Sequence, residues 1–124
     1  MIRGSCLCGT VRFEITAASG PIEICHCQRC RKTSGAAGLP VVPVRREDFR
    51  FVSGADEVVN YAAPLLYRPP AYHSAWCRRC GSPAPFTELP GDLEIPAGLF
   101  DDDPGVRGGR HIFVEFVPPW DRIS

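Results

Sequence analysis

Hydrophobic and polar residues alternate over several short stretches of the chain, whereas no long stretch repeats with the period of a helix. Val11, Phe13 and Ile15 share one face of residues 10–15, which is typical of a half-buried strand. The clearest alternation covers residues 111–117. The same pattern predicts further strands or extended pieces over residues 22–25, 41–44, 49–52, 58–61, 72–76 and 93–99.

Turn-forming residues separate these stretches. Segments 49–52 and 58–61 flank the sequence Ser-Gly-Ala-Asp, which predicts a hairpin. Good helix formers over residues 28–32 are followed by Gly35, which suits the end of a short helix. Residues 100–110 are rich in Asp, Gly and Pro and are expected to form a loop.

Composition supports a turn-rich, mainly β fold with little helix. The 124 residues include 13 prolines and 12 glycines, which argue against long helices. A chain of this length has room for one core, and no repeat or linker divides it. We therefore predict that residues 1–124 form a single domain.

Charge and hydropathy exclude several classes of protein. Lys and Arg number 14, as do Asp and Glu, so the formal net charge is zero and non-specific nucleic-acid binding is disfavoured. No apolar run approaches the roughly 20 residues that span a membrane, and the N-terminus lacks the pattern of a signal peptide. We expect a cytoplasmic protein in a reducing compartment, where clustered cysteines are more often metal ligands or catalytic groups than disulfides.

All seven cysteines fall into three clusters, which are the most specific feature of the sequence. The clusters are Cys6-x-Cys8, Cys25-x-Cys27-x₂-Cys30 and Cys77-x₂-Cys80. Two C-x₂-C units in one chain indicate zinc, because this spacing lets two sulfurs converge on one tetrahedral ion.

Seven ligands suggest one site of four cysteines and one site of three, although spacing alone does not say which clusters combine. A structural zinc is closed by four protein ligands, whereas a catalytic zinc has three and an open position. The triplet Cys25, Cys27 and Cys30 is compact enough to form a three-ligand site by itself. A closed site joining distant parts of the chain would then take the remaining cysteines, Cys6, Cys8, Cys77 and Cys80.

Two other interpretations of the cysteines stay open. All seven could serve purely structural sites, with His26, His73 or His111 completing the second tetrahedron. Cys27 and Cys30 could instead form a thioredoxin-like redox pair, although the chain shows no βαβ pattern. The roles of His26 and His73 are left open, and His111 is expected to be structural.

Basic residues lie beside the cysteines and could act in two ways. One role is to offset the negative charge of zinc–thiolate centres and to lower the thiol pKa values. The residues in question are Arg29, Arg31, Lys32, Arg78 and Arg79. Arg29, Arg31 and Lys32 are also candidate partners for the carboxylates of an anionic substrate.

Short motifs keep a fixed order along nearly the whole chain. They are Gly4-x-Cys6-x-Cys8-Gly9, Cys25-His26-Cys27-x₂-Cys30-Arg31-Lys32-x-Ser34-Gly35, Glu47-Asp48-Phe49, Cys77-x₂-Cys80-Gly81-Ser82, Gly98-Leu99-Phe100-Asp101-Asp102, His111-Ile112-Phe113-Val114 and Pro119-Trp120-Asp121. This pattern resembles the glutathione-dependent formaldehyde-activating (GFA) family, which includes the centromere protein V-like domain.

The resemblance implies a β-tent fold, in which antiparallel sheets pack around zinc with little helix. It also implies that the four-cysteine group holds a structural zinc, and that Cys25, Cys27 and Cys30 hold the catalytic zinc. Two zinc ions are expected, and the occupancy of the three-cysteine site is left open. The activity for which the family is named is that of a carbon–sulfur lyase, which interconverts S-(hydroxymethyl)glutathione with glutathione and formaldehyde.

A zinc ion held by three thiolates has chemistry that fits this activity. Three thiolates make the ion a weaker Lewis acid and favour a soft fourth ligand, such as a substrate thiol. Formaldehyde could then add to that sulfur or leave it. We therefore predict a zinc-dependent carbon–sulfur lyase acting on a thiol–aldehyde adduct, with glutathione as the small-molecule partner. The competing hypotheses are a non-enzymatic zinc-binding interaction module and an enzyme of the same fold with a different small substrate.

Overall fold

Nine β-strands, one α-helix and four short 3₁₀ turns make up the computed structural model, which describes residues 1–63, 67 and 70–121. The strands are β1 (Ile2–Ser5), β2 (Arg12–Ile15), β3 (Ile22–Cys25), β4 (Leu39–Val44), β5 (Phe49–Ser53), β6 (Val58–Ala63), β7 (Tyr72–Cys77), β8 (Leu93–Pro96) and β9 (Gly108–Ile112). The helical elements are α1 (Gln28–Ser34), η1 (Arg46–Asp48), η2 (Ala55–Glu57), η3 (Ala97–Leu99) and η4 (Val114–Phe116). The prediction of a mainly β fold with little helix is confirmed.

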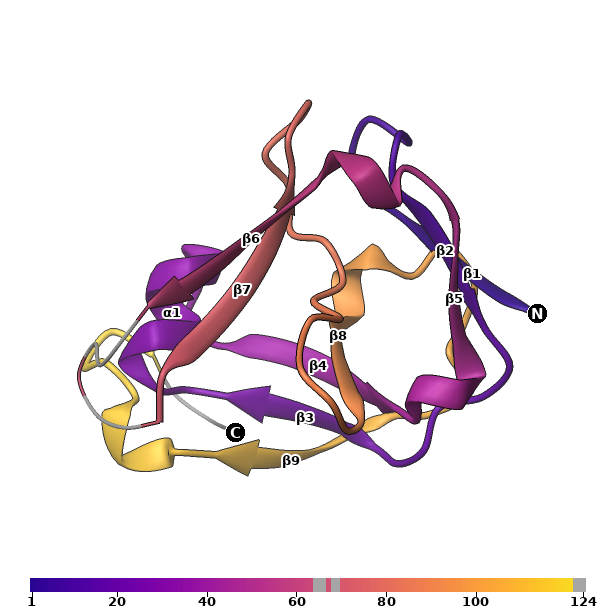
Figure 1. Ribbon diagram of the computed structural model, residues 1–124. Helices are drawn as coiled ribbons and strands as arrows, with labels where there is room; N and C mark the ends of the chain where they lie inside the picture. The colour runs from indigo at the N-terminus through magenta and orange to yellow at the C-terminus, as the bar shows by residue number, and fades with distance from the viewer. Residues whose placement is uncertain (64–66, 68–69, 122–124) are drawn as a thin grey trace.

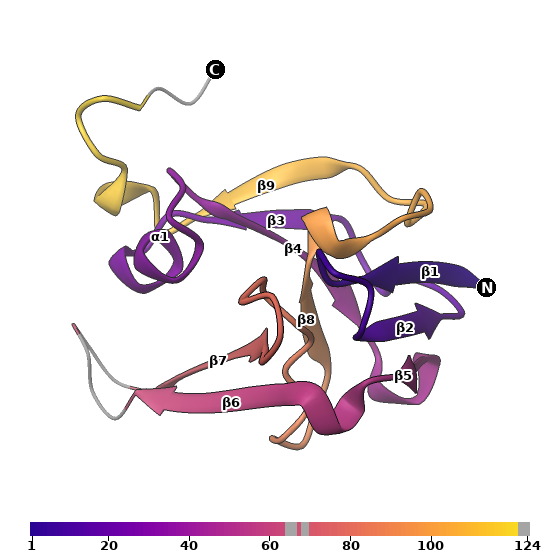
Figure 2. The same ribbon diagram turned by 90° about the horizontal axis from the view of Figure 1, so that it is seen from above.

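The strands form three small sheets (Figure 1). Their strand orders are β1-β2-β5, β8-β4-β3-β9 and β6-β7. These pairings are antiparallel, except that β3 and β9 run parallel. Figures 1 and 2 both place α1 and the β1-β2-β5 sheet at opposite ends of the molecule, so the helix is far from the N-terminal strands.

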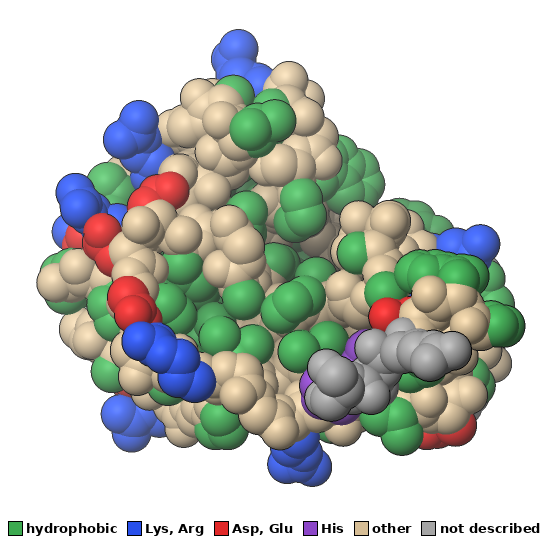
Figure 3. All heavy atoms as spheres, turned by 180° about the vertical axis from the view of Figure 1, so that it is seen from behind, with side chains coloured by type: hydrophobic (Ala, Val, Ile, Leu, Met, Phe, Trp, Pro, Cys, Tyr) green, Lys and Arg blue, Asp and Glu red, His purple; other side chains and the backbone are tan. Residues whose placement is uncertain are grey.

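The main hydrophobic core joins the β1-β2-β5 sheet to β4 and β8. Alternation along each strand sends every second side chain inward. The most deeply buried members of this core are Phe13, Ile15, Val42, Val44 and Ile95. Seen from behind, the molecule is hollowed, and hydrophobic side chains line most of the hollow (Figure 3). Among the described residues, no helix is long and apolar enough to cross a membrane.

The predicted short helix is confirmed, together with its end. α1 begins directly after Cys27 and is followed by Gly35, whose φ of 69° is left-handed. The Gly35 N–H donates to the Arg31 carbonyl at 2.7 Å, which satisfies one of the free carbonyls at the helix end. This helix therefore leaves Cys27 and Cys30 on one short, well-defined segment.

The hairpin predicted between residues 49–52 and 58–61 is wrong. β5 pairs with β2, whereas β6 pairs with β7 in a different sheet. Gly54 has a φ of 75°, and the turn η2 follows it at once, so the chain leaves one sheet and enters the next. The turn residues predict the change of direction but not the partner of each strand.

The strand predicted over residues 111–117 begins and ends earlier than expected. β9 covers Gly108–Ile112 and so includes the end of the predicted loop 100–110. Phe113 then takes a left-handed φ of 57°, and η4 follows. The alternation of residues 113–117 therefore does not correspond to a strand.

Gly54 offers a stability test with a matched control. Its φ is left-handed, and an added Cβ would clash with the Thr10 carbonyl. Gly105 has a φ of 79° but open space around it, so Gly105→Ala measures the backbone strain alone. We expect Gly54→Ala to lower the free energy of unfolding by about 1–3 kcal/mol more than Gly105→Ala. Urea unfolding of both variants measures the difference, and equal losses would contradict the prediction.

Candidate metal centres and cavity

Four cysteines from distant parts of the chain come together at one site. Their Sγ atoms all lie within 4.8 Å of one another. The Sγ of Cys8 is 3.7 Å from that of Cys6 and 3.9 Å from that of Cys77. We call this group the four-cysteine cluster, and its members are Cys6, Cys8, Cys77 and Cys80. The spacing of the sulfurs and the all-thiol donor set fit a tetrahedral zinc ion.

Two tight turns bring these cysteines into place. Gly9 and Gly81 have φ values of 80° and 76°, which few residues with a Cβ adopt. The Gly9 N–H donates to the Cys6 carbonyl at 3.0 Å, and the Gly81 N–H donates to the Cys77 carbonyl at 2.8 Å. Each turn thus folds one cysteine pair back on itself, and the two turns lie close together at the top of Figure 1.

Hydrogen bonds and burial act in opposite directions on the thiols of this cluster. The Ser82 hydroxyl lies 3.5 Å from Cys80 Sγ and lowers the pKa of that thiol to about 5. The Thr10 hydroxyl, 3.1 Å from Cys8 Sγ, lowers the pKa of Cys8. Desolvation raises the pKa of Cys77 to about 11. A bound cation would favour the thiolate form of all four, because a metal ion deprotonates its coordinating thiols.

The other three cysteines form a separate, buried group at the start of α1. Cys25 ends β3, Cys27 is the N-cap of α1 and Cys30 lies in its first turn. The Cys30 N–H donates to Cys27 Sγ at 3.4 Å, and the sulfurs of Cys25 and Cys27 are 3.5 Å apart. Each side chain is at most 7% exposed, and the three sulfurs lie within 4.8 Å of one another. We call this group the three-cysteine cluster.

The surroundings of the three-cysteine cluster favour a bound cation. A hydrogen bond with the Cys25 thiol and burial raise the pKa of Cys30, and the charges of Cys25 and Cys27 raise it further. Tyr72 donates a hydrogen bond to Cys30 Sγ at 3.8 Å, and burial raises the pKa of Tyr72 above its usual range. Three closely spaced sulfur donors in a buried site therefore fit a zinc ion, which would neutralise charges that the protein alone leaves uncompensated.

The two other interpretations of the cysteines receive no support from the geometry. β3, α1 and β4 do not form a parallel βαβ unit, since β3 and β4 are antiparallel, and all seven cysteines are free thiols. His26 Nε2 lies 2.8 Å from His111 Nδ1, and His73 stacks on Phe86 at 5.1 Å. Among the described residues, no histidine joins the three-cysteine cluster within ligand distance.

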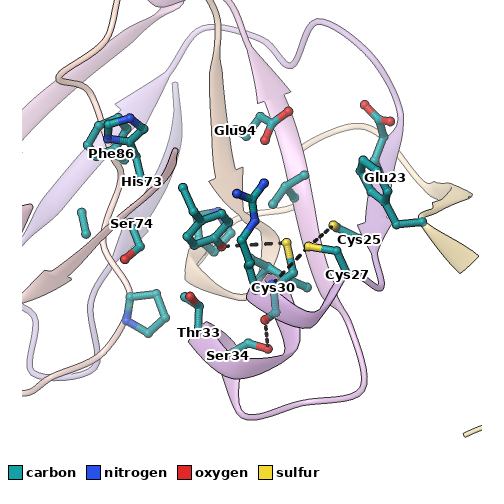
Figure 4. A pocket seen from close by; sticks show the side chains of 18 of the residues that line it. Glu23, Cys25, Cys27, Cys30, Thr33, Ser34, His73, Ser74, Phe86 and Glu94 are labelled. Atoms are coloured by element: carbon teal, nitrogen blue, oxygen red, sulfur yellow. Dashed lines mark hydrogen bonds between the residues drawn. The ribbon is translucent and has the colours of Figure 1, made fainter. Parts of the chain in front are cut away.

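A cavity of about 370 Å³ opens beside the three-cysteine cluster. Its walls come from β3, α1, β4, β7, β8 and β9 and from the segments that contain Pro70, residues 83–86 and Phe113. All three cysteines line it, together with aliphatic and aromatic side chains. Figure 4 shows the three sulfurs side by side, with Thr33 and Ser34 on one side of them and the carboxylates of Glu23 and Glu94 on the other. The cavity therefore gives a small molecule access to the sulfurs.

The three basic residues predicted to bind substrate occupy different environments. Arg29 lines the cavity and is only 8% exposed. Its Nη1 donates to the Pro70 carbonyl at 2.6 Å, and its guanidinium lies 5.0 Å from the centre of the Tyr72 ring. Arg31 is half-buried, Lys32 is exposed, and neither is among the described residues that line the cavity. At the other cluster, Arg79 pairs with Glu57 at 3.1 Å.

Sequence reasoning missed the two carboxylates of the cavity and Tyr72. Glu94 lies between Leu93 and Ile95, which are buried in the core, so strand alternation points Glu94 to the opposite face. The sequence shows that alternation, but it does not show the sheet order that places Glu94 on the wall of the same cavity as the cysteines.

The chain is thus a mainly β, cysteine-rich domain with two thiol clusters that are positioned to hold metal ions. The family model described as glutathione-dependent formaldehyde-activating enzyme matches residues 1–116, and the chain belongs to this GFA family. A Halomonas elongata protein named "Putative glutathione-dependent formaldehyde-activating enzyme" is 33% identical over 130 residues, covering 100% of this chain and 82% of that protein.

Two further similarities are narrower in what they show. A crystal structure of a Rhodobacter sphaeroides protein covers 86% of this chain and 99% of its own, with a TM-score of 0.60 and 23% identity, which shows a shared fold alone. A leucine–tRNA ligase of Phenylobacterium zucineum is 38% identical over 64 residues, but these are 52% of this chain and 6% of the ligase. No activity is inferred from that partial match.

Proposed function

We propose that this protein is a zinc-dependent carbon–sulfur lyase that acts on a thiol–aldehyde adduct. The best-supported pair is S-(hydroxymethyl)glutathione on one side and glutathione plus formaldehyde on the other. The observation that carries the proposal is the three-cysteine cluster, whose buried sulfurs face a cavity of about 370 Å³. Family membership supports glutathione-dependent formaldehyde activation, and the lyase reaction is our inference from the site.

Each cluster has its own role in this proposal. The four-cysteine cluster would hold a closed, structural zinc that joins β1 to β7. Cys25, Cys27 and Cys30 would hold the second zinc, which when bound supplies an open position suited to a soft thiolate ligand. With seven free thiols, the protein would work in the reducing cytoplasm.

The side chains around the three-cysteine cluster would prepare the site for a thiol. Tyr72 keeps its proton at neutral pH, because its pKa is raised, and can therefore donate a hydrogen bond to a sulfur. Leu39, Val41 and Ile112 give the cavity an apolar wall. Low local polarity strengthens each charge interaction with the substrate. The site would thus hold the sulfur of the adduct while the carbon–sulfur bond breaks. The electron pair of that bond stays on sulfur, the adduct's C–OH becomes the C=O of formaldehyde, and the hydroxyl proton ends on the released thiol.

The deciding experiment combines zinc content with turnover. We expect two zinc ions per chain, of which one leaves on mild chelation. We also expect the protein to release formaldehyde from S-(hydroxymethyl)glutathione by breaking the carbon–sulfur bond without water as a reactant. Loss of the labile zinc should stop turnover without unfolding the protein. One tightly held zinc, a vacant three-cysteine cluster in zinc-replete protein and no turnover would instead favour a non-enzymatic interaction module. Turnover of other thiol adducts alone would indicate a different small substrate.

The position of Arg29 predicts unequal effects of neutralising two cations on α1. Arg29 lines the cavity whereas Lys32 is exposed, so only Arg29 is placed to meet a substrate carboxylate. We expect Arg29→Gln to weaken glutathione binding by about tenfold, since hydrogen bonds to charged groups contribute about 1.5–3 kcal/mol. Lys32→Gln should leave the dissociation constant unchanged. Calorimetric titration of the zinc-loaded proteins measures both, and equal effects of the two changes would contradict the prediction.

A further inference from the structure

Two carboxylates line the cavity beside the three-cysteine cluster, and strand register explains why they lie on the same face. Glu23 of β3 is opposite Val41 of β4, and Val41 is opposite Pro96 of β8. Glu94 precedes Pro96 by two positions and therefore points to the same side of the sheet. All four residues line the cavity, and Figure 4 shows both carboxylates on the same side of the sulfurs.

Neither carboxylate is closely neutralised by the described part of the chain. Glu23 Oε2 is 3.8 Å from Arg110 Nε, and the Arg110 side chain is 71% exposed, so this ion pair is loose. Glu94 is exposed and has no hydrogen bond or ion pair with any described residue. Although Glu94 is exposed, partial desolvation by its neighbours and then the like charge of Glu23 raise its pKa above the ordinary value.

The other described residues of the cavity wall offer little positive charge to balance them. Arg29 is the one arginine or lysine among the described lining residues, and its Nη1 donates to the Pro70 carbonyl. A zinc ion with three thiolates would add a net charge of −1 at the other end. A ligand that fills this cavity would therefore be favoured if it placed a positive group near Glu94.

We infer that Glu94, together with Glu23, binds an ammonium group of the thiol substrate, so that the site selects amino thiols over thiols without an amine. The inference rests on the proposed function, because it supposes that the sulfur of the ligand lies at the three-cysteine cluster. An ammonium group fits two carboxylates, since its three N–H donors can reach both. A divalent metal ion does not fit as well, because Ca²⁺ takes six to eight oxygen ligands and Mg²⁺ six.

The test compares matched thiols that differ in one charge. Cysteamine and N-acetylcysteamine form a short pair, and glutathione and its N-acetyl derivative form a long pair. Calorimetric titration of the zinc-loaded protein gives the affinity ratio within each pair, for wild type and for Glu94→Gln. In at least one pair, we expect the wild-type protein to bind the thiol with the ammonium group about tenfold more tightly than its acetylated partner. The Glu94→Gln variant should bind the two thiols of that pair with about equal affinity. Differences in thiol acidity within a pair affect both proteins alike and cancel in this comparison.

Two further variants complete the design. Glu47→Gln removes an exposed carboxylate that is not part of the cavity and should keep the wild-type ratio. Glu23→Gln should reduce the ratio less than Glu94→Gln, since Arg110 already lies beside Glu23, and it tests the inference separately if Glu94→Gln fails to fold. If the affinity ratio falls in the Glu94→Gln variant for one pair alone, the inference is supported. The length of the thiols in that pair then indicates how far the ammonium group lies from the sulfur.

The outcomes separate this inference from the proposed function. If thiols bind and turn over but Glu94→Gln leaves both ratios unchanged, amine recognition by Glu94 is overturned and the lyase proposal stands. If no thiol of either pair binds to the zinc-loaded protein, the proposed function fails, and the inference fails with it.

Discussion

Replacing Cys77 by serine should lower the free energy of unfolding by more than about 4 kcal/mol, a loss expected only when a structural element such as a metal site is removed. Cys77 is fully buried, and its Sγ lies 3.9 Å from that of Cys8, 69 positions away in the chain. The buried hydrophobic residues around it, Val11, Ala75 and Ala84, are small, and the larger Phe51 and Phe86 that pack against them are only partly buried. This part of the fold therefore depends on the cluster rather than on a large apolar core.

Cys27→Ser is the matched control for this prediction. Cys27 is 1% exposed, so the same sulfur-to-oxygen change occurs at an equally buried position. The cost should be much smaller, because serine still caps a helix well and because the three-cysteine cluster closes only a short loop. Urea unfolding and zinc analysis of both variants test the comparison. Equal losses of stability would contradict the structural role of the four-cysteine cluster.

The sequence predicts local structure well and pairing between distant strands poorly. Alternation predicted β2, β3 and β7, and helix-ending signals predicted the end of α1. The partners of β5 and β6 depend on the turn at Gly54, whose left-handed φ directs the chain into another sheet. Likewise, β9 ends before Phe113, which has a left-handed φ, although the side chains of residues 111–117 alternate as they would in a strand. Local patterns carry no information about such tertiary choices.

In the candidate site, too, the grouping of the cysteines could be predicted from the sequence, whereas the residues around them could not. The cysteine spacing suggested one group of four and one of three, and the structure brings together the same two groups. The environment of the three-cysteine cluster could not be predicted in this way, because Tyr72, Glu23 and Glu94 reach it from three different strands. Sequence proximity also selected Arg31 and Lys32 beside Arg29, although the described cavity wall includes only Arg29.

The second large effect is expected from Cys27→Ser in the turnover assay. Loss of one of three sulfur ligands should reduce turnover of S-(hydroxymethyl)glutathione by more than about 100-fold, since even changes to partners of metal ligands typically cost 10–100-fold. Cys27 contacts the other two members of its cluster, lying 3.5 Å from Cys25 Sγ and accepting the Cys30 N–H at 3.4 Å. The change therefore acts on the geometry of the whole cluster.

The same variant distinguishes a catalytic cluster from one that only supports the fold. We expect Cys27→Ser to retain one zinc per chain, because the four-cysteine cluster is separate from the cavity, and to remain folded. Lys32→Gln, an exposed change on the same helix, should keep both zinc ions and full turnover. Equal turnover by Cys27→Ser and wild type would remove the catalytic assignment. Loss of turnover only in proportion to loss of folded protein would assign the three-cysteine cluster to stability instead.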